Sequence, residues 1–136
     1  MRRSVWFVLA CVLCAACGRS SAADNAEICQ DLVNLQATVD FLAAPGSATT
    51  VGEVRGALDK LDPTLQAVHN DGAVPDAEDD ALLDAQDAYR DEIDNLGDDT
   101  PFAPTAATTA SIAQGLLHSY EAVRQQLACP SDLEPG

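Results

Sequence analysis

Four stretches of this chain carry apolar residues at alternating intervals of three and four, and this spacing most constrains the fold. It places those residues along one face of an α-helix, whereas a strand would alternate every second residue. The clearest stretch opens at Thr50, which forms a predicted capping box with Glu53. Its apolar residues are Val51, Val54, Leu58, Leu61, Leu65 and Val68. Pro63 lies inside this pattern and predicts a kink or a break after Asp62.

Two further stretches have the same spacing. The first covers about residues 26–44 behind a predicted capping box of Asp24 and Glu27, and its apolar face is Ile28, Leu32, Leu35, Val39 and Leu42. The third is predicted to start after Pro75 and to end at Gly97. Its buried face is predicted to be Leu82, Ala85, Tyr89, Ile93 and Leu96.

The fourth stretch follows a start signal at Asp99 or Thr100 with Pro101, and Pro104 is expected to delay the regular helix. Its apolar stripe is Ile112, Leu116, Tyr120, Val123 and Leu127. No stretch has the alternation typical of a strand. Four helices with short connections predict an all-α protein, folded as an antiparallel four-helix bundle of up-down topology.

The N-terminal segment has the features of an export signal. Arg2 and Arg3 precede an apolar run over residues 5–16, and small residues lead up to Cys17. The run is far shorter than the ~20 residues that span a bilayer, which favours a removable signal. The segment resembles the lipobox of bacterial lipoprotein precursors. The resemblance implies cleavage before Cys17 and acylation of this cysteine, so that lipid anchors the protein to the extracytoplasmic face of the bacterial cell membrane.

A second cleavage site changes the predicted localisation. Residues 21–23 before Asp24 fit the small-x-small pattern of ordinary signal peptidase, which would release a secreted domain without lipid. With lipoprotein processing, the predicted organisation is a signal over residues 1–16 and a lipidated tether over residues 17–25. A bundle domain over residues 26–129 and a tail over residues 130–136 follow.

The cysteines support this organisation. Cys11 and Cys14 belong to the signal and Cys17 to the lipid anchor, which leaves Cys29 and Cys129. In an exported protein such a pair predicts a disulfide, worth about 4 to 5 kcal/mol on the chain-entropy estimate. A metal pair or a redox couple is the alternative, without CxxC spacing or companion ligands to support it. A disulfide between the first and the last helix favours four helices over three.

The mature part, bracketed by these cysteines, resembles small helical lipoproteins of actinobacteria, and the resemblance implies no particular activity. The chain has 22 acidic and 7 basic residues, and loss of Arg2 and Arg3 would leave a net charge near −17. Such a surface repels nucleic acid and anionic headgroups, and it favours cations or a basic protein partner.

Acidic residues recur at helical spacing along the third stretch, at Asp80, Asp84, Asp87, Asp91, Asp94 and Asp98. One interpretation is the solvated face of an amphipathic helix. The other is weak calcium-type cation binding at Asp91, Asp94 and Asp98, because Asp91, Glu92 and Asp94 crowd the negative end of the helix. The segment does not follow the EF-hand loop, and a rigid helix spreads its carboxylates too far apart for a tight cage.

Small residues form a ridge on the fourth stretch at Ser111, Gly115 and Ser119. The ridge predicts either close helix packing inside the bundle or an interface for a ligand or a partner helix.

A catalytic function has little support in the sequence. His69 and His118 are isolated, and His118 with Glu121 supplies only two ligands of a metal site. Motifs for phosphate binding, nucleophile activation or metalloprotease chemistry are missing, so we predict no enzyme and no cofactor. The predicted function is a cell-envelope lipoprotein that acts as a binding or structural module. An exported cation-binding module is the alternative.

Overall fold

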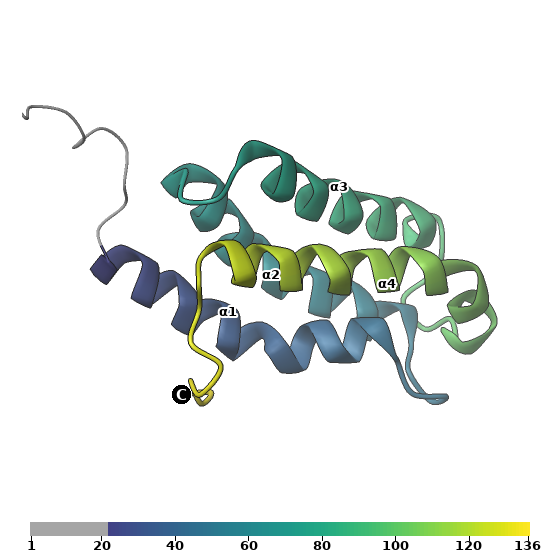
Figure 1. The fold of residues 1–136 in the computed structure, drawn as a ribbon. Coiled ribbons are helices and arrows are strands. Elements are labelled where there is room, and N and C mark those ends of the chain that lie inside the picture. The colour runs from purple at the N-terminus through teal and green to yellow at the C-terminus, as the bar shows by residue number, and fades with distance from the viewer. Residues whose placement is uncertain (1–21) are drawn as a thin grey trace, which may run out of the picture.

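A computed structural model describes the backbone of residues 22–136 and the side chains of residues 25–103 and 105–136 (Figure 1). Its four helices are α1 (Ala22–Ala43), α2 (Val51–Asp71), α3 (Asp76–Ile93) and α4 (Ala103–Gln126). The described residues contain no regular strand. These findings confirm the all-α bundle. The predicted signal segment and the lipidation site Cys17 lie outside the described residues.

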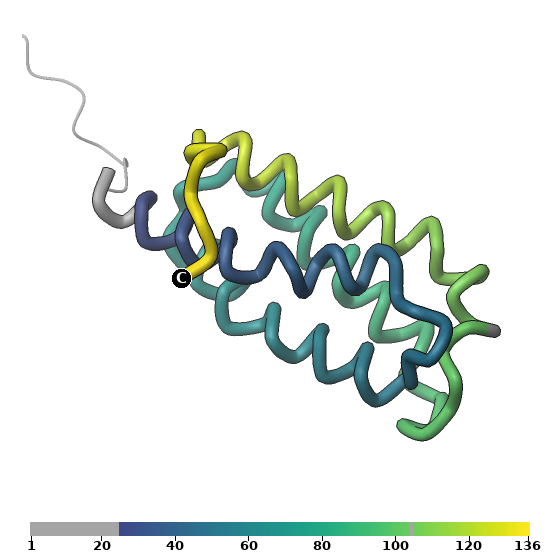
Figure 2. Tube along the Cα trace, turned by 90° about the horizontal axis from the view of Figure 1, so that it is seen from below, coloured from purple at the N-terminus to yellow at the C-terminus, as the bar shows by residue number. Residues whose placement is uncertain are grey.

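Each helix packs against two neighbours. Helix α1 lies between α2 and α4, and α3 packs against the same two helices from the other side. Successive helices run antiparallel, as the two views of the trace show (Figures 1 and 2). The predicted apolar faces meet in one core, and their less buried members are Leu35, Ala85, Leu96 and Ile112.

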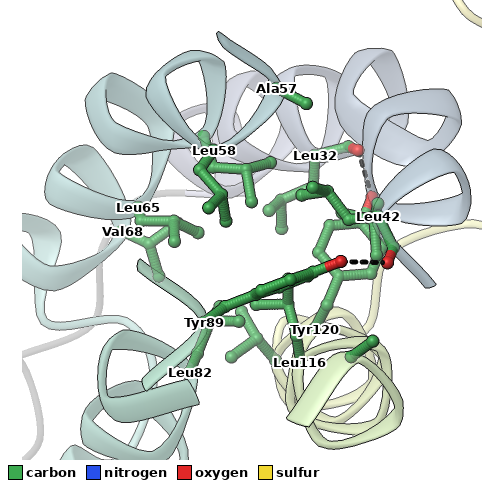
Figure 3. Packing of buried hydrophobic residues seen from close by; sticks show 14 of the residues in the cluster. Leu32, Leu42, Ala57, Leu58, Leu65, Val68, Leu82, Tyr89, Leu116 and Tyr120 are labelled. Carbon is green, nitrogen blue, oxygen red and sulfur yellow. Dashed lines mark hydrogen bonds between the residues drawn. The ribbon is translucent and has the colours of Figure 1, made fainter. Parts of the chain in front are cut away.

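Two tyrosines place their hydroxyl groups inside this core (Figure 3). The Tyr89 hydroxyl donates to the carbonyl oxygen of Leu42 at 2.9 Å, and the Tyr120 hydroxyl donates to the carbonyl oxygen of Leu32. Leu42 lies in the last turn of α1, where carbonyl groups lack helical partners. Burial raises the pKa of each tyrosine to about 12, so both remain protonated donors at physiological pH.

The disulfide closes one end of the bundle. The sulfur atoms of Cys29 and Cys129 are 2.02 Å apart, and the Cα atoms are 5.4 Å apart. This confirms the predicted pairing between the first and the last helix. The C-terminal tail then crosses α1 (Figure 2), because the Glu134 carbonyl accepts from Gln30 Nε2 at 3.0 Å and Gly136 N donates to the side chain of Asn34 at 2.9 Å.

The two loops at the other end pair with each other. Phe102 N donates to the Thr49 carbonyl at 2.8 Å, and Val51 N donates to the Thr100 carbonyl at 2.9 Å. These bonds occupy backbone groups that the helix ends leave free. They precede α4, which begins at Ala103 with a proline in its first turn, in agreement with the delay expected from Pro104.

Helix α2 confirms the strongest local signals. The capping box of Thr50 and Glu53 is present, and the whole predicted apolar stripe is buried. The C-terminal cap is Gly72, whose φ of 65° lies in the left-handed region that glycine adopts without strain. Of the kink or break predicted after Asp62, the break was wrong, because the helix continues through Pro63 to Asp71.

Two other helix boundaries differ from the predictions. Helix α1 begins at Ala22, so Asp24 lies within it and is not an N-terminal cap. Helix α3 ends at Ile93, before the predicted Gly97. The Arg55 guanidinium donates to the carbonyl oxygens of Ile93, the last residue of α3, and of Leu96 in the loop that follows, each at 3.2 Å from Nη2. An arginine from α2 therefore binds the chain where α3 ends.

None of the helices in residues 22–136 combines the length and the apolar character that a membrane crossing requires.

Candidate functional site

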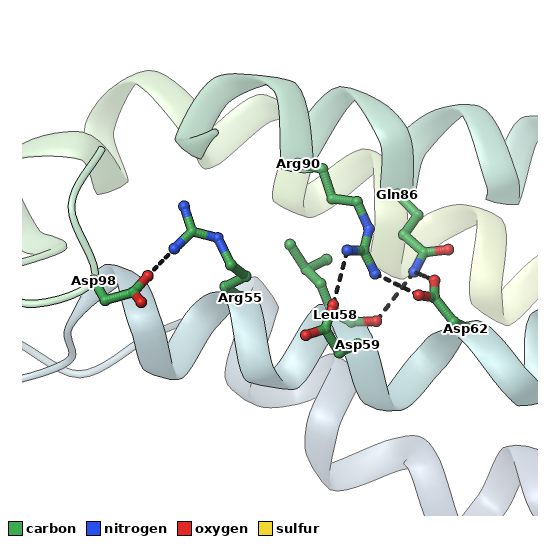
Figure 4. Close-up of polar contacts among 7 residues, drawn as sticks. All are labelled: Arg55, Leu58, Asp59, Asp62, Gln86, Arg90 and Asp98. Carbon is green, nitrogen blue, oxygen red and sulfur yellow. Dashed lines mark hydrogen bonds and ion pairs between the residues drawn. The ribbon is translucent and has the colours of Figure 1, made fainter. Parts of the chain in front are cut away.

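All six aspartates of the predicted acidic face are exposed, and two of them, Asp94 and Asp98, lie beyond the end of α3. Of the three cation candidates, Asp98 forms an ion pair with Arg55 (Figure 4), while Asp91 and Asp94 are exposed. In the described part of the chain, three possible metal ligands lie close together at a different place, around His69. The solvated-face interpretation of α3 agrees with this exposure.

The ridge of small residues on α4 lies at the surface. Ser111 and Gly115 are exposed, Ser119 is half-buried, and a Cβ atom added at Gly115 would have no neighbour within 4 Å. The interpretation as close helix packing inside the bundle was therefore wrong. The interpretation as an interface stays a prediction.

Polar side chains link α2 to α3 along the middle of the bundle (Figure 4). Arg90 donates to Asp59 and to Asp62, each at 2.8 Å. Gln86, which is buried, donates to the Leu58 carbonyl at 3.1 Å and to Asp62 at 2.5 Å. All of these partners belong to the bundle itself, so the network holds the two helices together.

A groove of about 470 Å³ runs between α1 and α2, in the half of the bundle opposite the disulfide. This volume is within the roughly 300 to 1,000 Å³ of typical ligand sites. The groove is lined by Ala37, Thr38, Phe41, Gly56 and Ala57, with Glu53 and Lys60 at its two ends along α2. Most of its lining is apolar. Ala57 lies at the edge of the core beside α1 (Figure 3).

Small side chains produce the groove. A Cβ atom added at Gly56 would have no neighbour within 4 Å, so the space over this residue is empty of protein. Ala37 on the facing helix is exposed and Phe41 is half-buried, which leaves apolar surface in contact with solvent. A glycine inside a helix costs about 0.5 to 1 kcal/mol relative to alanine, and no packing contact at Gly56 offsets that cost.

Lys60 is the chain's single lysine and is exposed at one end of the groove. Within residues 25–136, the arginines are already engaged: Arg55 and Arg90 form ion pairs, and Arg124 donates to Gln36 at 2.7 Å. Lys60 forms no hydrogen bond or ion pair in that part of the chain. It therefore offers an uncommitted positive charge beside apolar surface.

Glu53, at the other end of the groove, is already bonded within the capping box. Its carboxylate accepts from Thr50 N at 2.8 Å and from the Thr50 hydroxyl at 3.2 Å. Seven residues separate Glu53 from Lys60 along α2, or about 10 Å of helix. The groove thus has a negative end, an apolar middle and a positive end, which suits binding and orientation of a small molecule.

A second cluster joins the end of α2 to the start of α3. His69 Nδ1 lies 2.5 Å from Asp79 Oδ2, and with Asp80 the three residues place ligand atoms within 4.8 Å of one another. The side chain of Asp79 is only 8% exposed, whereas that of His69 is 48% exposed. The hydrogen bond to Asp79, together with its charge and those of Asp80 and Asp76, raises the pKa of His69.

Sequence reasoning missed both sites. It treated His69 as isolated because Asp79 is ten positions away and belongs to the next helix. Two sequence signals pointed to the groove, namely a mid-helix glycine at Gly56 and the lone lysine at Lys60. No known protein family, characterised protein or solved structure shows significant similarity to this chain.

Proposed function

We propose that this protein is a lipid-anchored, non-catalytic binding protein of the bacterial cell envelope, and that the groove between α1 and α2 is its ligand site. The observation that carries the proposal is the groove itself. It is an open, mainly apolar space over Gly56. Its volume, its mainly apolar lining and the uncommitted charge of Lys60 support a small-molecule site.

The disulfide supports the envelope location, because disulfides persist in oxidising compartments outside the cytosol. The anchor at Cys17 is proposed from the N-terminal sequence. An anchored Cys17 would lie five residues before α1 begins at Ala22. The groove residues on α1 start at Ala37, about 22 Å further along the helix, so the groove would face away from the membrane.

The anchor is tested by the intact mass of the protein from its native host and by its partition between membrane and soluble fractions. The proposal expects a membrane-bound species that begins at Cys17 and carries added acyl mass. A soluble species that begins at Asp24 would contradict lipid anchoring and make this a secreted binding protein.

The ligand site is tested by native mass spectrometry of the protein isolated from its host. The wild-type protein is expected to carry a small-molecule adduct that Gly56→Leu lacks, because the leucine side chain fills the groove. Gly115→Leu is the matched control, since Gly115 is also a helical glycine with no neighbour within 4 Å of an added Cβ atom. An adduct that survives Gly56→Leu, or no adduct on the wild type, would contradict the proposed site.

Cation binding is a second candidate function, favoured by the cluster of His69, Asp79 and Asp80. An imidazole with two carboxylates suits zinc better than calcium, which prefers oxygen ligands alone. Thermal melting with added zinc or calcium tests this function. Zinc is expected to raise the melting temperature of the wild type but not of His69→Gln, and no shift with either ion would remove the candidate.

A further inference from the structure

The charged residues of the groove indicate the class of ligand that it binds. This inference rests on the proposed function. We infer that the α1–α2 groove takes a single-chain amphiphile of the fatty-acid class, with its apolar chain over Gly56 and its carboxylate at Lys60.

The apolar part of the ligand follows from the groove lining. Ala37, Ala57 and Phe41 offer apolar surface, and the empty space over Gly56 lies between the two helices. Burial of apolar ligand surface here releases water from both partners. The groove is only about 10 Å long between its charged ends, which is two helical turns. That length suits one short chain better than a docked helix of a partner protein.

The negative head follows from which charges are free. The carboxylate of Glu53 already accepts from the backbone and hydroxyl of Thr50, whereas the ammonium of Lys60 has no partner in the described part of the chain. A ligand carboxylate beside Lys60 forms an ion pair. At the other end of the groove the same carboxylate would be repelled by the negative charge of Glu53. The two ends therefore give the ligand one favoured direction, with its head at Lys60 and its chain toward Phe41.

The overall charge of the protein favours the opposite kind of ligand, so a preference for an anion distinguishes binding in the groove from nonspecific binding. A domain with 22 acidic residues attracts cations and repels anions over most of its surface. Salt at physiological strength screens this field beyond about 8 Å, so the charges of the groove lining itself, Lys60 and Glu53, matter most within the groove. Nonspecific binding would consequently favour a cationic amphiphile, and specific binding in the groove favours an anionic one.

The test compares three probes that share one chain and differ in the head group: decanoate, decanol and decyltrimethylammonium. Decanoate and decyltrimethylammonium are kept below their micelle concentrations, and decanol is kept below its solubility limit. Binding is measured by titration calorimetry on the protein carrying Cys17→Ser, so that no acyl group of its own competes. Decanoate is expected to bind most tightly. Lys60→Gln should weaken decanoate about three- to fivefold, as expected for a partly exposed ion pair, and should leave decanol unchanged.

Each test variant, Lys60→Gln and Gly56→Leu, has a matched control variant on α4. Gln114→Glu changes the net charge by the same amount as Lys60→Gln at an exposed site on α4, and it should leave decanoate affinity unchanged. Gly56→Leu should abolish binding of decanoate and decanol, whereas Gly115→Leu should preserve both.

The results separate the inference from the proposed function. If decanol or the cationic probe binds as tightly as decanoate and Lys60→Gln has no effect, while Gly56→Leu still blocks binding, the groove is the site and the anionic class is wrong. If none of the probes binds, the fatty-acid class is overturned, and the adduct measurement still decides on the groove. If decanoate binding survives Gly56→Leu, both the inference and the groove are refuted.

Discussion

Two glycines in α2, Gly52 and Gly56, are predicted to respond in opposite ways to alanine. A Cβ atom at Gly52 would lie 3.0 Å from Asp98 Cβ and 3.2 Å from the Asp98 carbonyl oxygen. That oxygen also accepts from Gly52 N at 2.9 Å, and the Asp98 carboxylate pairs with Arg55. The loop cannot move aside without loss of these bonds. A Cβ atom at Gly56 has no neighbour within 4 Å.

The expected magnitudes follow from these contacts. Overpacking costs about 1 to 3 kcal/mol, and replacing a helical glycine with alanine returns about 0.5 to 1 kcal/mol. Gly52→Ala should therefore lower the free energy of unfolding by about 1 kcal/mol, within a range of roughly 0 to 2.5 kcal/mol. Gly56→Ala should raise it by about 0.5 to 1 kcal/mol.

Urea unfolding followed by circular dichroism, with the disulfide intact, measures both variants against the wild type. The midpoints should move in opposite directions at an unchanged slope, which would show that stability and not the extent of unfolding has changed. A Gly52→Ala protein at least as stable as Gly56→Ala would refute the close approach between the start of α2 and the loop before α4.

Three further predictions concern the bonds that join the helices. Tyr89→Phe keeps the ring but leaves a buried carbonyl at the end of α1 without its donor, so urea unfolding should show a loss of about 1 to 2 kcal/mol. Cys29→Ser should cost about 2 to 5 kcal/mol in the same assay, and reduction of the wild type with dithiothreitol should reproduce that loss. Because Asp79 raises the pKa of His69, the stabilisation is complete below pH 6.5 and declines as pH rises through the raised pKa. The thermal midpoint in chelator should fall over that window in the wild type and stay flat there in His69→Gln.

The sequence was sufficient to predict those elements whose signals lie within a short stretch of the chain. The capping box of Thr50 and Glu53 and the apolar stripe behind it lie within one helix, so the start and the buried face of α2 could be predicted. Counting cysteines was likewise enough to pair Cys29 with Cys129, because the other cysteines belong to the proposed signal and anchor.

The boundaries that failed are set by contacts between distant parts of the chain. Where α3 ends, Arg55 on another helix binds the carbonyl groups of Ile93 and Leu96. The loop before α4 is held by the bond between Phe102 and Thr49 across the end of the bundle. A pattern of residues within a single helix carries no information about these partners.

The candidate site was missed for a related physical reason. A groove exists where two helices present small side chains to each other, so Gly56 has meaning only once it faces Ala37 on α1. The acidic residues of α3 are far more conspicuous in the sequence, yet most of them are exposed and without an ion pair in the described structure. The many aspartates of the acidic face belong to a solvated surface, whereas the single lysine lines the groove.

The most direct test of the groove as the ligand site is a two-dimensional amide NMR spectrum of the isotopically labelled protein, titrated with decanoate. We predict that the shifting resonances cluster in the second half of α1 and the first half of α2, around Phe41 and Lys60, and that they stop shifting at saturation. Shifts that spread evenly over the exposed face of α3, or that concentrate on α4, would contradict the account.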